Sequence, residues 1–229
     1  MSINKIAKKF ICVAAAHVLL SAFVCAQNIW TASDFFKEIS KLYSSFSTYE
    51  ADIQIAYDKT EMAGKVSYKS PDLLRIDFSE PENQVIVFNG ELLTIYLPES
   101  AAILQQSVQK GGNSGASLAT AQGLALMNRY YSVAYEVGPS PVPLDSNSSE
   151  MVVKLLLTRR NSSESFRTIQ LAVNPSTKLI RRIEAETTKG ETYVFNFLDY
   201  RLNPEIPDQR FIYDPPSSAN NYNNFLFSE

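Results

Sequence analysis

Carboxylates are the side chains of this sequence that could carry out acid–base chemistry. Glu184 and Glu186 lie two residues apart in the segment RRIEAET, so a strand would place both carboxyl groups on one face. Two carboxyl groups so arranged could serve as the acid and the base of a hydrolase. Their alternation with Ile183 and Ala185 favours a simpler interpretation, the wet face of a half-buried strand.

A second acidic group surrounds Pro81 and consists of Asp77, Glu80 and Glu82. This composition is typical of a solvated strand end. No glycine-rich phosphate loop stands between a strand and a helix, and no cluster of aspartates has the spacing of metal ligands. The sequence therefore gives an enzyme little support.

The start of the chain resembles a secretory signal peptide. Three lysines precede an apolar run over residues 10–24, which is too short to span a membrane comfortably. Val24-Cys25-Ala26 then offers a small residue at a cleavage point. We expect residues 1–26 to be a signal peptide that is cleaved after Ala26, with export to the periplasm. The alternative is a lipobox centred on Cys25, which would give a lipid-anchored protein.

Cleavage at this point would remove both cysteines and the one histidine, namely Cys12, Cys25 and His17. A disulfide, a thiol nucleophile, a Ser-His-Asp triad and the usual zinc ligands would all be lost with them. We therefore expect no metal and no cofactor. The whole chain has a net charge of −3, and its charges are dispersed, which argues against nucleic acid as a partner.

The elements that follow are two helices and many short strands. Residues 31–49 begin with an amphipathic helix that Thr31 or Ser33 could cap, with Asp34 in the first turn. Its apolar stripe consists of Phe35, Phe36, Ile39, Leu42 and Tyr43. A second helix is expected over 116–130, after a flexible loop at 110–115.

From residue 50 the apolar period changes to two, which indicates strands. Asn89-Gly90 is a strong hairpin signal between two of them. We expect strands at 50–58, 62–69, 73–80, 84–97 (a hairpin), 101–108, 132–138, 151–159, 165–173, 179–187, 192–202 and 210–216. One curved antiparallel sheet or barrel is the economical arrangement, with both helices on its concave face. Residues 217–229 form a polar tail that we expect to be loose.

Two segments carry a resemblance to a known family. Residues 69–96 contain K-x-P-x-x-x-R, an acidic-Pro-acidic corner, Asn-Gly and a strand that ends in Ile-Tyr. Residues 197–216 read F-L-D-Y-x-x-N-P-x-I-x-x-x-x-F-x-Y-x-P-P. Both resemble the periplasmic outer-membrane lipoprotein carriers of the LolA family. The resemblance spans nearly the whole exported part, so residues 27–216 are expected to form one carrier-like domain.

This resemblance implies an unclosed antiparallel β-barrel of about eleven strands, with helices as a lid over an apolar cavity. It implies a monomeric, non-enzymatic carrier of acylated lipoproteins. The expected partners are an inner-membrane lipoprotein-releasing ABC transporter and an outer-membrane acceptor. An acceptor, or a lipid-sensing regulator with the same fold, is the alternative function.

The expected lipid-binding residues follow from alternation, from the helix stripes and from the resemblance. They are Phe35, Ile39, Leu42, Ile53, Ile55, Val66, Tyr68, Leu74, Ile76, Phe78, Ile86, Ile95, Leu124 and Leu126. Periodicity alone does not separate a cavity lining from an ordinary core, and it is the resemblance that favours a lining. Glycines near the second helix (Gly111, Gly112, Gly115 and Gly123) could give such a lid compliance.

One departure from the family concerns control of the lid. The family has an arginine just before the first proline of the 69–96 segment, and Ser70 stands there in this chain. Arg75 could substitute for it, although it falls on the opposite pleat face from Leu74 and Ile76. The family's tryptophan on this strand corresponds to Ile76. The residue that holds the lid shut is thus expected to differ.

Overall fold

The computed structural model describes residues 30–108 and 119–224 of the 229-residue chain. Three segments that the sequence analysis singled out lie outside the described residues: the predicted signal peptide, the loop at 110–115 and the end of the polar tail. The chain divides into two compact units, residues 1–30 and 31–229. The fold described below is that of the second unit.

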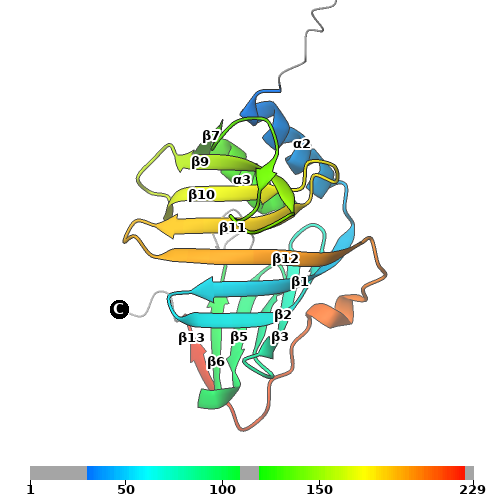
Figure 1. Ribbon diagram of the computed structural model, residues 1–229. Coiled ribbons are helices and arrows are strands. Elements are labelled where there is room, and N and C mark those ends of the chain that lie inside the picture. The colour runs from blue at the N-terminus through cyan, green and yellow to red at the C-terminus, as the bar shows by residue number, and fades with distance from the viewer. Residues whose placement is uncertain (1–29, 109–118, 225–229) are drawn as a thin grey trace, which may run out of the picture. The chain divides into compact units, whose positions relative to one another are not determined.

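One sheet of thirteen strands dominates the described residues, and the two ends of its strand order do not pair with each other (Figure 1). The order is β13-β6-β5-β4-β3-β2-β1-β12-β11-β10-β9-β7, with β8 beside β9. Neighbouring strands are antiparallel, apart from the parallel pair β13–β6. The predicted mainly-β, unclosed sheet with two helices is confirmed, with more strands than expected.

The first half of the chain supplies one helix and six strands. They are α2 (Ala32–Ser44), β1 (Thr48–Tyr57), β2 (Thr60–Lys69), β3 (Leu73–Glu80), β4 (Val85–Phe88), β5 (Leu92–Leu97), the 3₁₀ turn η1 (Pro98–Ser100) and β6 (Ala102–Ser107).

The second half supplies the other helix and seven strands. They are α3 (Ala121–Tyr130), β7 (Tyr131–Tyr135), β8 (Val142–Pro143), β9 (Met151–Arg159), β10 (Phe166–Val173), β11 (Ile180–Thr187), β12 (Thr192–Leu202), the 3₁₀ turn η3 (Asp208–Phe211) and β13 (Asn220–Asn223).

Period-two alternation places apolar side chains in continuous rows across neighbouring strands. In one such row Val66 pairs with Ile76, Ile76 with Ile86, and Ile86 with Ile95. We call the face that carries these rows the inner face. Polar side chains such as Arg75 alternate with them and lie on the outer face.

Both helices pack on the inner face, at the end of the sheet formed by β7, β9, β10 and β11 (Figure 1). Thr31 caps α2, because its hydroxyl oxygen accepts a hydrogen bond from the backbone N–H of Asp34 at 3.1 Å. Thr120 caps α3 in the same way, through the N–H of Gly123 at 3.0 Å. The sequence left Thr31 and Ser33 open as caps for α2, and the structure selects Thr31.

The C-terminal part of the fold differs from expectation. No strand forms at 210–216: its first two residues end the 3₁₀ turn η3, which buries Phe211, and residues 212–216 have no regular structure. The expected loose tail instead contains β13, whose backbone pairs with the edge of β6. Sequence alternation gave no signal for β13, because this strand buries no side chain and is held through its backbone.

Gly64 in β2 marks a close approach between neighbouring strands. A Cβ atom at Gly64 would lie 2.8 Å from the Cα of Phe78 and would also collide with the carbonyl oxygen of Asp77. The register between β2 and β3 shifts at this point, between Ala63 and Gly64. A missing side chain therefore permits the irregularity that bends this part of the sheet.

The first prediction concerns this glycine. Gly64→Ala should lower the free energy of unfolding by roughly 2 kcal/mol or more, because two backbone segments must separate to admit the methyl group. Urea denaturation followed by circular dichroism measures the effect. Ala63→Ser, at the preceding position, is the control and should change stability little. An unfolding midpoint unchanged by Gly64→Ala would show that β3 does not approach β2 this closely.

Candidate apolar binding face and its helix cover

The predicted lipid-binding residues are brought together by the fold, with one exception. All but one belong to a single core cluster or pack against it: Phe35, Ile39, Leu42, Ile53, Ile55, Val66, Tyr68, Leu74, Ile76, Phe78, Ile86, Ile95 and Leu124. The exception is Leu126, which is half-buried outside this cluster. It lies two residues beyond Leu124, and the helix has turned by about 200° over that distance. Met127 takes its place in the core.

Burial is uneven along this apolar face. Ile39, Tyr68 and Leu124 are fully buried, at 0% exposure, and are therefore committed to packing. Some inner side chains of β2 and β4, such as Val66 and Phe88, are also buried. Four inner side chains of β2, β4, β5 and β12 are only half-buried: Met62, Ile86, Ile95 and Phe195. An apolar guest could contact these side chains with less repacking than the fully buried ones would require.

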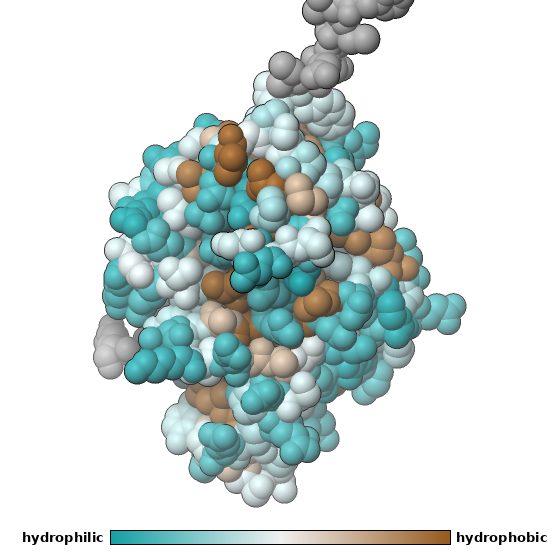
Figure 2. Space-filling view, viewed as in Figure 1, coloured by the Kyte–Doolittle hydropathy of each residue, from teal (hydrophilic) through white to brown (hydrophobic). Residues whose placement is uncertain are grey.

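The opposite side of the sheet has a different character. On the face shown in Figure 2, apolar residues occur only in small groups among hydrophilic ones. The largest cluster of buried apolar side chains belongs to the inner face, which the helices cover in part, and a smaller one consists of Leu144, Val152 and Ala172.

A ring of hydrogen bonds joins α2 to the sheet. The backbone N–H of Ile180 donates to the hydroxyl oxygen of Tyr43 at 3.0 Å. The Tyr200 hydroxyl donates to the carbonyl oxygen of Ile180 at 3.0 Å, and the two tyrosine oxygens are 3.0 Å apart. These directions leave Tyr43 as the donor to Tyr200. The ring satisfies two buried hydroxyls and both backbone groups of Ile180.

A second tyrosine joins the sheet to the start of α3. The Tyr49 hydroxyl, on β1, donates to the carbonyl oxygen of Ala119 at 2.9 Å. The Tyr49 side chain is 1% exposed, and its ring contacts those of Tyr43, Tyr68 and Tyr200. The same aromatic group therefore touches both helix attachments. Sequence reasoning placed Tyr43 on the apolar stripe but missed its polar role, because its partners lie 157 and 137 residues away.

Burial perturbs the acidity of these hydroxyls. Removal from water raises the pKa of Tyr43 from 10.0 to about 12, and its hydrogen bonds with Tyr200 and Ile180 oppose the shift. The pKa values of Tyr49 and Tyr200 are raised well above 10.0 for the same reason. All three tyrosines are therefore neutral at physiological pH and act as hydrogen-bonding groups.

Arg75 lies on the outer face and holds the C-terminal segment. Its guanidinium binds Asp77, with the nearest N–O distance 2.8 Å, and donates to the carbonyl oxygen of Arg210 at 3.1 Å. Arg210 in turn pairs with Asp77, and Arg75 stacks over Tyr213 at 5.7 Å. The contacts of Arg75 thus go to the segment that crosses the back of β3, and its control of a lid stays a prediction.

Ser70 makes a different kind of contact. Its backbone N–H donates to the carbonyl oxygen of Ser47 at 2.8 Å, which ties the end of β2 to the start of β1. This bond would form with any residue other than proline at the position. A role for the Ser70 side chain in lid control also stays a prediction.

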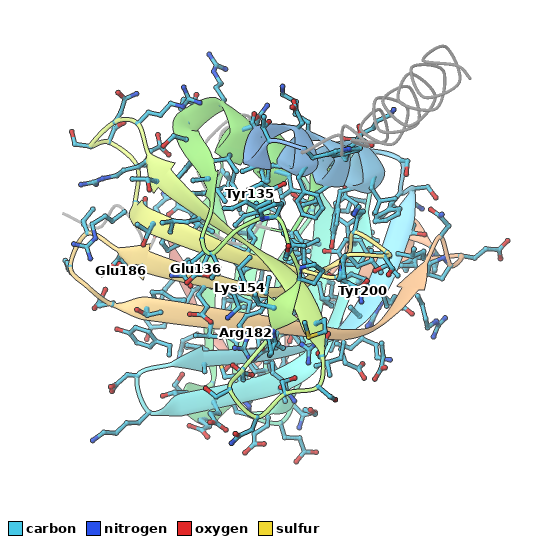
Figure 3. The ribbon with its side chains drawn as sticks, turned by 45° about the horizontal axis from the view of Figure 1, so that its top comes forward. Tyr135, Glu136, Lys154, Arg182, Glu186 and Tyr200 are labelled. Carbon is cyan, nitrogen blue, oxygen red and sulfur yellow. The ribbon has the colours of Figure 1, made fainter. Side chains whose placement is uncertain are left out.

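The candidate catalytic carboxylates are on the outer face, and arginines engage both. Glu184 lies 3.6 Å from Arg182, and Glu186 pairs with Arg167 and accepts from Thr168 at 3.1 Å. A shallow open hollow near Glu184 is lined mainly by polar side chains, among them Glu136, Lys154 and Arg182 (Figure 3). These are ion pairs of a wet surface, as the alternation indicated.

Residues 30–108 and 119–224 contain no group of three His, Cys, Asp or Glu side chains placed to hold a metal ion. None of the helices described is long and apolar enough to cross a membrane.

Several known proteins are similar to this chain in fold or in sequence. A structure of an uncharacterized conserved protein from Thermus thermophilus shares the fold, with a TM-score of 0.52 at 13% identity over 82% of this chain and 96% of that one. An outer-membrane lipoprotein carrier protein of Coxiella burnetii is 27% identical over 203 residues, covering 86% of this chain and 88% of the relative. The carrier protein of Pseudomonas aeruginosa is 20% identical over 156 residues, covering 68% and 69%.

The fold is therefore that of an unclosed sheet with an apolar inner face and a helix cover. The family profile described as "Outer membrane lipoprotein carrier protein LolA" matches residues 44–214, and the chain belongs to the LolA family. This family consists of periplasmic lipoprotein carriers and not of enzymes.

The second prediction concerns pH. Because the pKa of Tyr43 is higher in the folded state than in the unfolded chain, its contribution to stability is intact below about pH 10 and is lost as the pH rises towards about 12. Tyr43→Phe should lower stability at neutral pH, since it leaves the backbone N–H of Ile180 without its acceptor and the Tyr200 hydroxyl without its donor. In the variant, the free energy of unfolding should also fall less steeply with rising alkaline pH than in the parent, by roughly 1 kcal/mol per pH unit.

Urea unfolding at several pH values between about 8 and about 11 measures both effects. Tyr222→Phe, on the exposed strand β13, is the control and should match the parent protein at every pH. An equal alkaline slope in Tyr43→Phe and the parent would contradict the assigned burial of this hydroxyl.

Proposed function

We propose that this protein shields the acyl chains of lipoproteins against its inner apolar face and carries them through the periplasm. In this proposal it accepts cargo from an inner-membrane lipoprotein-releasing ABC transporter and delivers it to an acceptor at the outer membrane. The observation that carries the proposal is the continuous apolar inner face, which runs from β9 to β5 beneath two helices. Membership in the LolA family supports it.

The physical requirements of a carrier agree with such a face. Each CH₂ group that leaves water gains about 0.8 kcal/mol, so long acyl chains bind without directional bonds. A wall without hydrogen-bonding groups lets the chains slide out again. The half-buried side chains of β2, β4, β5 and β12 are the part of the inner face best placed to meet a chain first.

Binding deep in the cluster requires a helix to move, because Ile39 and Leu124 are fully buried. We expect α3 to move and α2 to stay. Tyr43 of α2 takes part in the closed ring with Tyr200 and Ile180, whereas the start of α3 is joined to β1 by the bond from Tyr49 to Ala119. In this proposal Tyr49 holds the lid shut, which is the role that the family's arginine at the position of Ser70 has.

The third prediction tests the binding face. Ile95→Glu should abolish binding of a fluorescent fatty acid, because it places a charge among the half-buried inner side chains. Leu92→Glu is the matched control: it lies on the same strand, is also half-buried, but falls on the opposite pleat face. It should bind as the parent does. Circular dichroism checks that both variants fold. Equal binding of the fatty acid by the two variants would contradict the proposed site.

The fourth prediction tests the moving helix. Tyr49→Phe should increase hydrogen exchange of the α3 amides by roughly fivefold or more, because one buried hydrogen bond contributes about 1 kcal/mol. The amides of β10 should exchange as before. Tyr43→Phe serves as the comparison and should affect α2 first. If Tyr49→Phe leaves α3 as protected as in the parent protein, the bond to Ala119 does not hold the cover in place.

A further inference from the structure

The arginines of the described residues fall into two groups. Most form an ion pair with a carboxylate: Arg75, Arg167, Arg181, Arg182, Arg201 and Arg210. Arg129, Arg159 and Arg160 have no carboxylate oxygen within 4.0 Å in the part of the chain that the structure describes. Among the described residues, the lysines without such a partner are scattered over separate elements: Lys41, Lys59, Lys154, Lys178 and Lys189.

The three unpaired arginines gather at one place, the junction of α3 and β7. Arg129 is in the last turn of α3 and stacks over Tyr130 at 5.3 Å. Arg160 donates from its backbone N–H to the carbonyl oxygen of Tyr130 at 2.8 Å and from Nε to that of Tyr131 at 3.0 Å. Arg159 pairs with Tyr131 in the β7–β9 register. We call these three residues the arginine group.

Contacts within the fold use only some of the hydrogen-bond donors of the arginine group. Arg159 is half-buried and donates to the carbonyl oxygens of Ser162 and Glu164, at 3.3 and 3.2 Å. Arg129 suits the negative end of the α3 dipole. Each guanidinium has five N–H donors, however, and Arg129 and Arg160 are exposed. Glu164, whose backbone carbonyl accepts from Arg159, is 6% exposed.

The surroundings indicate what kind of partner fits. Protein interfaces are usually centred on exposed apolar or aromatic anchors. The exposed large apolar residues of this domain lie away from the group: Val137 and Met151 are at the opposite ends of β7 and β9, and Leu202, Ile212 and Tyr222 belong to β12 and the C-terminal segment. A positively charged patch without an apolar centre suits the anionic surface of a lipid bilayer. Such a surface attracts basic side chains through its negative potential and needs no shape complementarity.

We propose that the arginine group is a docking site for anionic phospholipid headgroups and that it brings the α3 end of the sheet to the membrane surface. The chain as a whole carries a net charge of −3, so general attraction to such a surface is not expected and the local group sets the orientation. This inference goes beyond the carrying of cargo, because it assigns a contact with the bilayer itself, next to the helix expected to move.

Vesicle co-sedimentation tests the inference with protein purified from the envelope of expressing cells. The probes are phosphatidylcholine vesicles with and without about 30% phosphatidylglycerol. The parent protein should bind the vesicles that contain phosphatidylglycerol but not those without it, and the binding should weaken as the salt concentration rises. The double variant Arg129→Gln/Arg160→Gln should lose roughly 30-fold in partition coefficient, because each arginine near an anionic surface contributes about 1 kcal/mol.

A matched control removes the same charge elsewhere. Lys59→Gln/Lys189→Gln changes two exposed cations on other turns of the sheet, and it should bind the vesicles as the parent does. Both double variants should still bind a fluorescent fatty acid, which separates this inference from the carrier proposal. Absence of parent binding to anionic vesicles, or equal losses in the two double variants, would overturn it. Binding to soluble polyglutamate but not to vesicles would overturn it in favour of an acidic polypeptide partner.

Discussion

An open sheet with one apolar face has to keep that face from water, and this constraint shapes the rest of the domain. The face runs from β9 to β5 and exceeds what two helices of 13 and 10 residues can cover. At the β9–β11 end the helices complete a packed core, and at the other end side chains such as Ile86 and Ile95 stay half-buried. In the proposed function, this gradient of burial lets the face receive acyl chains.

The two helices differ in their polar contacts with the sheet, and in the proposed function this difference holds α2 in place and lets α3 move. Tyr43 fastens α2 through a closed ring with Tyr200 and Ile180, and Tyr49 reaches the start of α3 through one hydrogen bond. Hydroxyls suit this purpose better than charges at so buried a place, because an unpaired charge left behind by an opened cover would be costly. Arg75, the charged alternative, instead fastens the C-terminal segment on the outer face.

The sequence predicted those features that depend on local periodicity. Alternation in β3 separated Leu74 and Ile76 from Arg75, and the helix stripe found Phe36 and Ile39. The sequence pattern could not predict β13, since a strand held only by its backbone leaves no periodic pattern of side chains. Nor could it find the ring between Tyr43 and Tyr200, because that ring depends on how distant elements meet in space. Leu126 is predicted together with Leu124 as part of a lid, but the helix period directs the two side chains to different faces of α3.

The central claim is that the inner face holds lipoprotein acyl chains, and native mass spectrometry tests it most directly. The protein is isolated from the envelope of cells that express it, without detergent, and its mass is recorded with bound species preserved. The account predicts a population with added masses that match acylated proteins, and this population should be absent from Ile95→Glu and present in Leu92→Glu. A parent protein that carries no acylated protein and also fails to take up an added fatty acid would contradict it.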